Sequence, residues 1–309
     1  MEDYVKVLVK RFEHIQAQRD NWDTHYQELG DYMLPRKADI VKKRSRGEKR
    51  MEFIYDGTAL QAVDLLSASL HGMLTSGASP WFHLDVKDTE LNRDDEVREW
   101  LQDTSMRMMR AFNQSNFETE VHELYVDLVV FGTGCMFVEM DKGQIRCSTR
   151  HISEFYVQED QYGIVDTVFR KYHISAVAAV QRFGIDGVSD HIKKVYEKTP
   201  DEQVELLHCV TPRVERDIRK RDSKNMPYMS VHICMQTKMV MSEGGFEELP
   251  YVVPRFLKAT GEVMGRSPAM VALPDVKMLN LMSKTIIQAA QKMIDPPLLV
   301  PDDGFLLPI

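Results

Sequence analysis

Apolar residues recur every three or four positions through the first 131 residues of the chain, and this spacing predicts amphipathic helices. The helices predicted in this way cover residues 3–34, 58–74, 94–113 and 116–131. Pro35 ends the first helix, Thr58 and Gln61 have the spacing of a capping box at the start of the second, and Asn116 opens the fourth. Each helix has one apolar face, so each is expected to pack against another element.

From residue 135 onward the pattern changes to short runs rich in β-branched and aromatic residues, which predict strands. These runs cover residues 135–140, 154–160, 164–172, 204–210, 228–236 and 251–257. Short helices are predicted between them: one from Ser175 to Phe183, with Ser175 as its cap and Gly184 ending it, and one from about Ser189 to Lys198. Helices followed by grouped strands predict an α+β fold, with amphipathic helices packed on a mostly antiparallel sheet.

A long helix is predicted from Ser267 to about Ile294. Ser267 can cap it and Pro268 suits its first position, whereas Pro274 is expected to interrupt or kink its start because proline has no N–H to donate. The helix beyond Pro274 would be a rod about 30 Å long. Its apolar side carries Val276, Leu279, Met282, Ile286, Ala290 and Met293. Its other side carries Lys277, Asn280, Lys284, Gln288 and Gln291.

Composition narrows the classes of protein that fit. A chain of 309 residues with 43% hydrophobic content can form one large or two modest domains. Its formal net charge of -8 argues against binding nucleic acid over the whole surface. The run 36–50 carries eight Lys and Arg residues and is expected to be a mobile, solvated loop, with nucleic-acid contact as the alternative. No stretch approaches the ~18 uncharged apolar residues that span a bilayer, so we expect no membrane partner and assembly in the cytoplasm.

Motifs for catalysis or metal binding are lacking in the sequence. It contains no GxxxxGK[ST] phosphate-binding loop, no GxSxG nucleophile elbow and no HExxH zinc motif. Its four cysteines include no CxxC pair and are expected to stay reduced. His232 and Cys234 would face one side of a strand, which favours core packing over a zinc site. We therefore expect no cofactor, no metal and no enzyme activity.

The segment from His71 to Ser79 is the remaining candidate for chemistry, because it combines a histidine with hydroxyls and glycines. A hydrolase that uses this loop is the alternative function. The segment lacks an acid and a base that would activate its hydroxyls, so a structural turn anchored by Trp81 and Phe82 is the preferred interpretation.

Four segments in a fixed order resemble the head-to-tail connector, or portal, proteins of short-tailed double-stranded DNA phages. The segments are residues 55–84, 116–139, 155–175 and 250–300, and the resemblance extends over about 4–300. It implies a structural protein that forms a ring, usually of twelve copies, at one vertex of the capsid. Family members are usually longer, so the chain is expected to lack the second stem helix, the tunnel loop and the crown.

The resemblance also implies a domain division and partners. Residues 1–265 would be the α+β wing, and 266–309 the first stem helix with the start of the clip. The polar side of that helix, named above from Lys277 to Gln291, would face the DNA channel, and the apolar side, from Val276 to Met293, would pack within the ring. The expected partners are phage DNA, the packaging terminase, scaffolding and capsid proteins, and tail adaptor proteins, in a virion assembled in the host cytoplasm.

Overall fold

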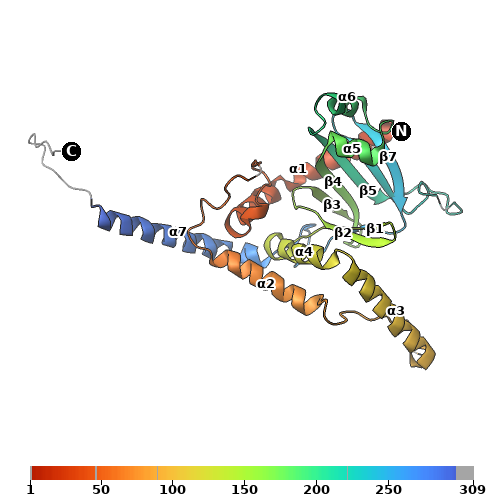
Figure 1. Cartoon of the computed structure of the whole chain (residues 1–309), viewed down its shortest axis with the longest axis horizontal. Coiled ribbons are helices and arrows are strands. Elements are labelled where there is room, and N and C mark those ends of the chain that lie inside the picture. Colours follow the sequence, from red (N-terminus) through yellow and green to blue (C-terminus); the bar gives the residue numbers. More distant parts are fainter. Residues whose placement is uncertain (1, 46, 89, 221, 297–309) are drawn as a thin grey trace, which may run out of the picture.

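A computed structural model describes residues 2–45, 47–88, 90–220 and 222–296. Figure 1 shows a body built on sheets and helices, from which α3 (Asp95–Gln114) and α7 (Pro268–Ile294) extend in different directions. The α+β class and the long C-terminal helix are as the sequence predicts. The expected clip residues from 297 onward lie outside the described residues.

The larger sheet is antiparallel throughout the described part of the chain. The order of its strands is β3 (Phe155–Glu159), β4 (Val165–Ser175), β5 (Gln203–Pro212), β6 (Tyr228–Cys234) and β7 (Met239–Phe246). The sequence predicts all of these except β7, whose Gly244 and Gly245 weaken the strand pattern.

Helices cover both faces of this sheet. Successive strand residues point to opposite sides, and both sides carry apolar residues that pack against helices. On one face α1 (Glu2–Met33) places Phe12 against Phe169, with ring centroids 6.1 Å apart. On the other face lie α5 (Ala176–Phe183) and α6 (Asp190–Lys198), which pack on the alternate residues of β4, β5 and β6.

A smaller antiparallel sheet lies next to α4 (Phe117–Phe131). Its strand order is β2 (Gln144–Thr149), β1 (Met136–Asp141) and β8 (Tyr251–Val252). The largely polar β2 is not predicted from the sequence, and β8 is shorter than the run 251–257 because Pro254 cannot donate to a ladder.

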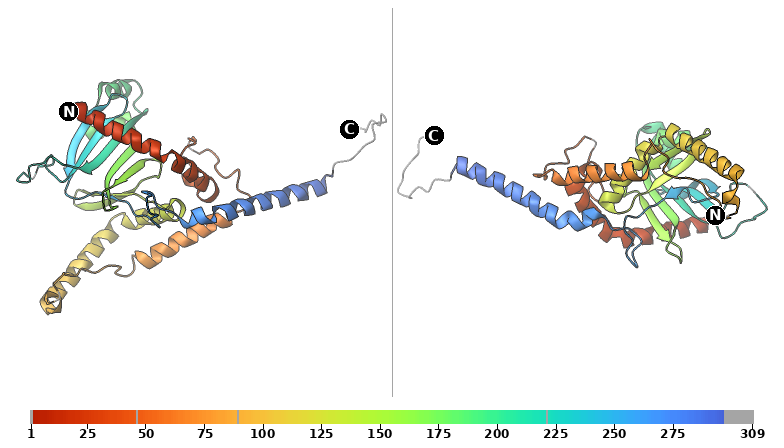
Figure 2. Two further views of the ribbon diagram at one scale, coloured as in Figure 1. Left: turned by 180° about the vertical axis from the view of Figure 1, so that it is seen from behind. Right: turned by 90° about the horizontal axis from the view of Figure 1, so that it is seen from below.

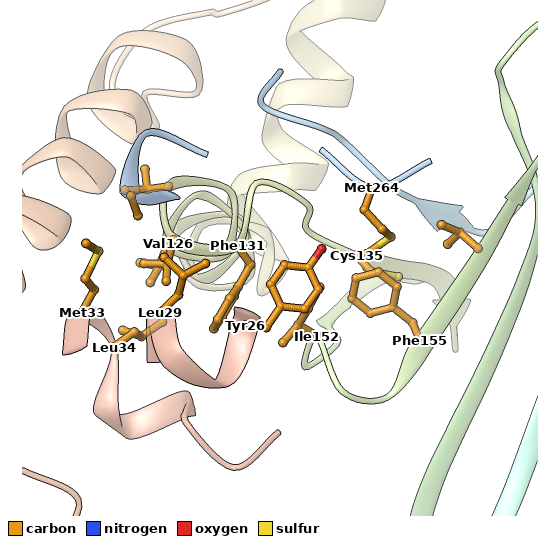
Figure 3. Close-up of a cluster of buried hydrophobic side chains, with 14 of the residues drawn as sticks. Tyr26, Leu29, Met33, Leu34, Val126, Phe131, Cys135, Ile152, Phe155 and Met264 are labelled. Atoms are coloured by element: carbon orange, nitrogen blue, oxygen red, sulfur yellow. The ribbon is translucent and has the colours of Figure 1, made fainter. Parts of the chain in front are cut away.

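The largest hydrophobic cluster joins the helices to the sheets, as Figure 3 shows. Tyr26 of α1 is fully buried and packs edge-on against Phe131 of α4, with ring centroids 5.7 Å apart. Ala269 and Leu273, in the first turns of α7, belong to the same cluster. The start of α7 is therefore part of the body's core.

The helix starts confirm some predicted caps and correct others. Ser175 and Ser189 each accept a hydrogen bond from a backbone N–H three residues on, as predicted. The capping box of Thr58 is wrong: α2 (Thr58–Leu74) begins after Gly57, and the N–H of Thr58 donates to Asp56 Oδ1 at 3.0 Å. Asn116 precedes α4, but its amide bonds the backbone of Cys147 instead of the helix.

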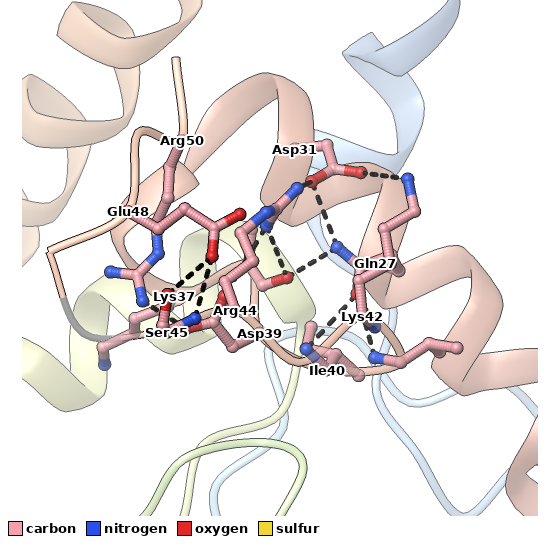
Figure 4. A network of polar contacts seen from close by, with 12 residues as sticks. Gln27, Asp31, Lys37, Asp39, Ile40, Lys42, Arg44, Ser45, Glu48 and Arg50 are labelled. Carbon is pink, nitrogen blue, oxygen red and sulfur yellow. Dashed lines mark hydrogen bonds and ion pairs between the residues drawn. The ribbon is translucent and has the colours of Figure 1, made fainter. Parts of the chain in front are cut away.

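The basic run is folded against the body, as Figure 4 shows. Its ion pairs are Arg36 and Lys37 with Glu123, Lys37 with Asp127, Arg44 with Asp31, and Arg50 with Asp39. Gln27 Oε1 accepts hydrogen bonds from the backbone N–H groups of residues 40–42. The run is therefore tied to α1 and α4 by ion pairs and is not a free loop, although residues 41–43, 45 and 47–49 are exposed to solvent, as the sequence predicts.

Helix α3 does not pack as its apolar stripe predicts. Along its described length only Leu101 and Ser105 are buried, and Trp100 is 64% exposed. Near its C-terminal end, Phe112 lies 5.9 Å from the ring of Trp81, and the same Trp81 ring stacks on Phe117 of α4 at 5.8 Å, both distances between ring centroids. Trp81 and Phe82 thus anchor the segment after α2 to the junction of α3 and α4, while most of α3 extends into solvent.

Candidate functional site

The start of α7 is fixed by its cap. Ser267 Oγ accepts from the N–H of Met270 at 3.0 Å and donates to the carbonyl of Val130 at 2.8 Å, so the same hydroxyl caps α7 and ties it to α4. Pro268 occupies the first turn, as predicted. The helix runs continuously through Pro274, so the proline does not interrupt it.

The segment before α7 crosses the end of α4 at close range. Gly132 has φ +75°, the left-handed conformation that ends α4, and a Cβ on Gly265 would overlap the carbonyl oxygen of Gly132. The N–H of Gly265 donates to Thr133 Oγ1 at 2.7 Å. These contacts require glycine at both positions and hold the base of α7 rigidly.

Polar contacts hold α7 where it leaves the body. Asn280 Oδ1 accepts from the N–H of Tyr55 at 2.7 Å and of Asp56 at 3.2 Å, and its Nδ2 donates to the carbonyl of Phe53 at 2.9 Å. One turn before Asn280 on α7, Lys277 forms an ion pair with Glu28 of α1. Asn280 is 8% exposed and is the last buried side chain along the described length of α7.

Beyond Asn280 the helix extends free of the body, as Figures 1 and 2 show. Every described residue from 285 to 296 is exposed, although many are apolar. Ile286 is 68% and Met293 82% exposed. A free helix with so much uncovered apolar surface marks an interaction site.

The apolar surface of this helix extends around about half of its circumference. At about 100° per residue, the polar row from Lys277 to Gln291, with Lys292 at its edge, covers roughly a third of the circumference, and Leu281 lies beside this row, about 20° around the helix from Gln288. The outer row, opposite to it, consists of Leu279, Met282, Ile286, Ala290 and Met293. The near flank consists of Val276, Ile287 and Ile294. The far flank, on the other side, consists of Met278, Leu281 and Ala289.

The near flank leads to a hollow between α7 and α2. The hollow measures about 140 Å³, and its lining is apolar. Ala59, Ala62 and Leu66 of α2 form one wall, and Ala272 and Val276 of α7 form the other.

The predicted site residues are brought together only in part. Leu279, Met282, Ile286, Ala290 and Met293 do form one exposed row. Within the polar row, Lys277, Asn280 and Lys284 contact residues 28–55 of the same chain, with Lys284 Nζ 5.4 Å from the Tyr55 ring centroid. Asn280 is buried, so it does not line a wet channel here. Of the flank residues, only Val276 is among the predicted packing residues; Met278, Leu281, Ile287, Ala289 and Ile294 are not, although apolar residues on either side of the outer row were the available signal.

Comparison with known proteins decides the family. A sequence model of the family described as "Bacteriophage head to tail connecting protein" matches residues 5–308. The chain belongs to this family. The chain is 32% identical over 302 residues to "Probable portal protein" of Bordetella phage BPP-1. The aligned region covers 96% of this chain and 54% of that protein. The chain is 34% identical over 300 residues to "Portal protein" of Salmonella phage epsilon15, covering 95% and 54%. It thus spans about half the length of these curated relatives.

Among the described residues, the loop from His71 to Ser79 shows no hydroxyl hydrogen-bonded to a base. Around it, the hydroxyls of Ser67 and Ser69 donate to backbone carbonyls, and Ser76 Oγ accepts from the N–H of Ala78. The His71 ring packs near His122 and Tyr125, and among the described residues no hydroxyl bonds to it. Nothing in the described part of the chain favours the hydrolase alternative.

A metal site is also absent from the described residues. They contain no group of three or more His, Cys, Asp or Glu able to hold a metal ion, and His208 and His232 pack against each other in the core. In the same part of the chain, no helix has both the length and the apolarity to span a bilayer.

Proposed function

We propose that this chain is a subunit of the portal of a bacteriophage, a ring of twelve copies at one capsid vertex. The ring passes DNA during packaging and ejection, receives the packaging terminase, contacts scaffolding and capsid proteins, and binds tail adaptor proteins. It acts in the virion after assembly in the host cytoplasm, and it acts structurally, without catalysis. The family membership and the portal proteins related to it support this proposal.

The free half of α7 carries the proposal. Its apolar surface covers about half of the circumference, whereas a helix that packs on a single partner needs a stripe of about 100°. A helix between two neighbours in a ring is covered on both flanks, and its polar row stays wet. The exposed distal half of α7 has this distribution of side chains.

The distal end of the polar row suits a DNA channel. Gln288 and Gln291 are exposed and uncharged, and the chain as a whole is acidic. Each phosphate held by a cation adds salt-dependent affinity, which would oppose sliding of DNA. We therefore assign Gln288 and Gln291 to the channel wall, and Lys277, Asn280 and Lys284 to contacts within the subunit.

Mass photometry of the protein expressed from its full reading frame tests the proposal. The expected result is a closed ring, seen as one high-mass species and as circular particles by negative-stain microscopy. A folded protein that stays monomeric at all concentrations would overturn it.

A pair of substitutions ties the result to α7. Ile286→Asp places a charge in the outer row and should abolish rings while leaving the circular dichroism spectrum unchanged. Gln288→Asp, two residues away on the polar row, is the matched control and should still form rings. Equal loss in both variants would contradict the assigned faces.

A further inference from the structure

The hollow between α2 and α7 is shaped to take an apolar group. It is open to solvent beside Ala62 and Ala272, both of which are exposed or partly exposed at its rim, and Val63 and Val129 lie among its lining. Alanine at its rim lets another backbone approach closely. A cavity of roughly 150 Å³ lined by aliphatic side chains holds a benzene-sized group, so this hollow of about 140 Å³ fits one large aliphatic side chain.

The side chains of the far flank match the hollow in chemistry and are themselves uncovered. Leu281 is 63% exposed and Met278 is 53% exposed. They lie on the side of α7 away from the near flank, roughly 140° from Val276 in the case of Leu281. The same helix thus has a large aliphatic side chain on one flank and an empty apolar hollow beside the other.

We propose that Leu281 of one copy inserts into the α2–α7 hollow of the next copy, with Met278 packing beside it on Ala62. The partner is a second copy of this chain, since each copy offers both halves of the contact and portal proteins form rings. This inference rests on the proposed function and adds the surfaces that join neighbouring subunits.

The two halves of this contact lie on different surfaces, so the interface is heterologous. A two-fold dimer would place Leu281 of each copy against the same patch of its partner and would stop at two copies. When Leu281 of one copy fills the hollow of a second copy, the hollow of the first copy and Leu281 of the second copy are still free to bind further copies. Assembly therefore continues until a ring closes.

Disulfide cross-linking tests the pairing. The double variant Ala62→Cys/Leu281→Cys should give a ladder of linked species under oxidising conditions on a denaturing gel. A mixture of the two single variants should give linked dimers and nothing larger, because each chain then carries one introduced thiol. The native cysteines at 135, 147, 209 and 234 are buried and stay in place.

The matched control is Ala62→Cys/Ser283→Cys, which moves the second thiol two residues along α7 and about 160° around the helix from Leu281. It should give no ladder. Rings without a disulfide between positions 62 and 281, or with equal linking to position 283, would overturn the inference and leave the proposed ring intact. Linking of Leu281→Cys to itself would also overturn it. Absence of any ring would overturn both proposals.

Filling the hollow is an independent test. Ala62→Leu should raise the concentration needed for half-assembly about tenfold or more, because one large aliphatic side chain loses its burial site. Ala62 is exposed, so the melting temperature should stay the same. Unchanged assembly by Ala62→Leu would contradict the inference.

Discussion

The rings of His208 and His232 lie stacked inside the body, with centroids 4.0 Å apart and planes within 10°. They stand opposite each other on β5 and β6. His208 bonds the hydroxyls of Tyr251 at 2.8 Å and Ser230 at 2.9 Å, so both rings are packed as neutral groups. Burial lowers the pKa of His208 well below its usual value and lowers the pKa of His232 to about 3.

The stack predicts loss of stability in acid. The unfolded chain takes up protons near pH 6.5, but the folded protein does not, so stability falls as the pH drops from about 6.5 toward 3. At pH 4.5, His232 contributes a loss of about 3 kcal/mol, at roughly 1.4 kcal/mol per unit below 6.5. Urea unfolding between pH 7.5 and 4.5 measures it.

His232→Gln should flatten this dependence relative to the unaltered protein. The exposed His191 provides the control, since His191→Gln should leave the slope unchanged. Equal slopes in all three proteins would show that the stack does not resist protonation.

Gly265→Ala should be strongly destabilising. The added Cβ overlaps the backbone of Gly132, and neither backbone can move without displacing the start of α7. We expect a loss of about 3 kcal/mol in the free energy of unfolding. Gly72→Ala is the control: its Cβ meets no atom within 4 Å, so it should gain up to about 1 kcal/mol of helix propensity. Thermal denaturation that ranks the two variants equally would contradict the close crossing.

Asn280→Ala should free the distal half of α7 with a modest cost of about 1 kcal/mol, because the N–H groups it releases are near the surface and can bond water. Hydrogen exchange at the amides of Tyr55 and Asp56 should accelerate about tenfold or more. Asn280→Asp keeps the acceptor for both amides but turns an oxygen toward the carbonyl of Phe53, so it should lower stability while leaving the two amides better protected than in Asn280→Ala. The exposed Gln288→Ala should leave both amides protected; unchanged exchange in Asn280→Ala would disprove the contact.

Gln27→Ala should loosen the basic run. Its amide oxygen accepts hydrogen bonds from the backbone N–H groups of residues 40–42 and so holds this segment against α1. Limited trypsin digestion should cut at Lys42 and Lys43 several times faster than in the unaltered chain. The exposed Gln18→Ala on the same helix is the control. Equal cleavage rates would mean that the ion pairs hold the run without Gln27.

Local signals made much of the fold predictable. Periodic apolar spacing located α1 and α7, and the hydroxyls of Ser175, Ser189 and Ser267 marked helix starts that the structure confirms. Capping depends on residues adjacent in sequence, so short-range rules suffice. The predicted capping box at Thr58 was wrong because the carboxylate of Asp56, two residues earlier, accepts a hydrogen bond from the backbone N–H of Thr58.

Contacts between distant segments were not predictable in the same way. The basic run looked solvated because its partners, Glu123 and Asp127, lie some 90 residues away. Asn280 looked like one more polar residue of the helix, yet its partners are residues 53–56. The hollow beside α2 also arises from packing, since no pattern in either helix indicates how far apart they lie.

The contacts of Ser267 and Asn280 also limit how far α7 can tilt relative to the body. About 21 Å of helix extends past Asn280 to Ile294, at ~1.5 Å per residue. A tilt of 10° about Asn280 would displace the tip by about 4 Å, close to the width of a side chain. In the ring proposed above, copies that differed in tilt by that amount could not present the same row to their neighbours, so the amide of Asn280 would give every subunit the same tilt of α7.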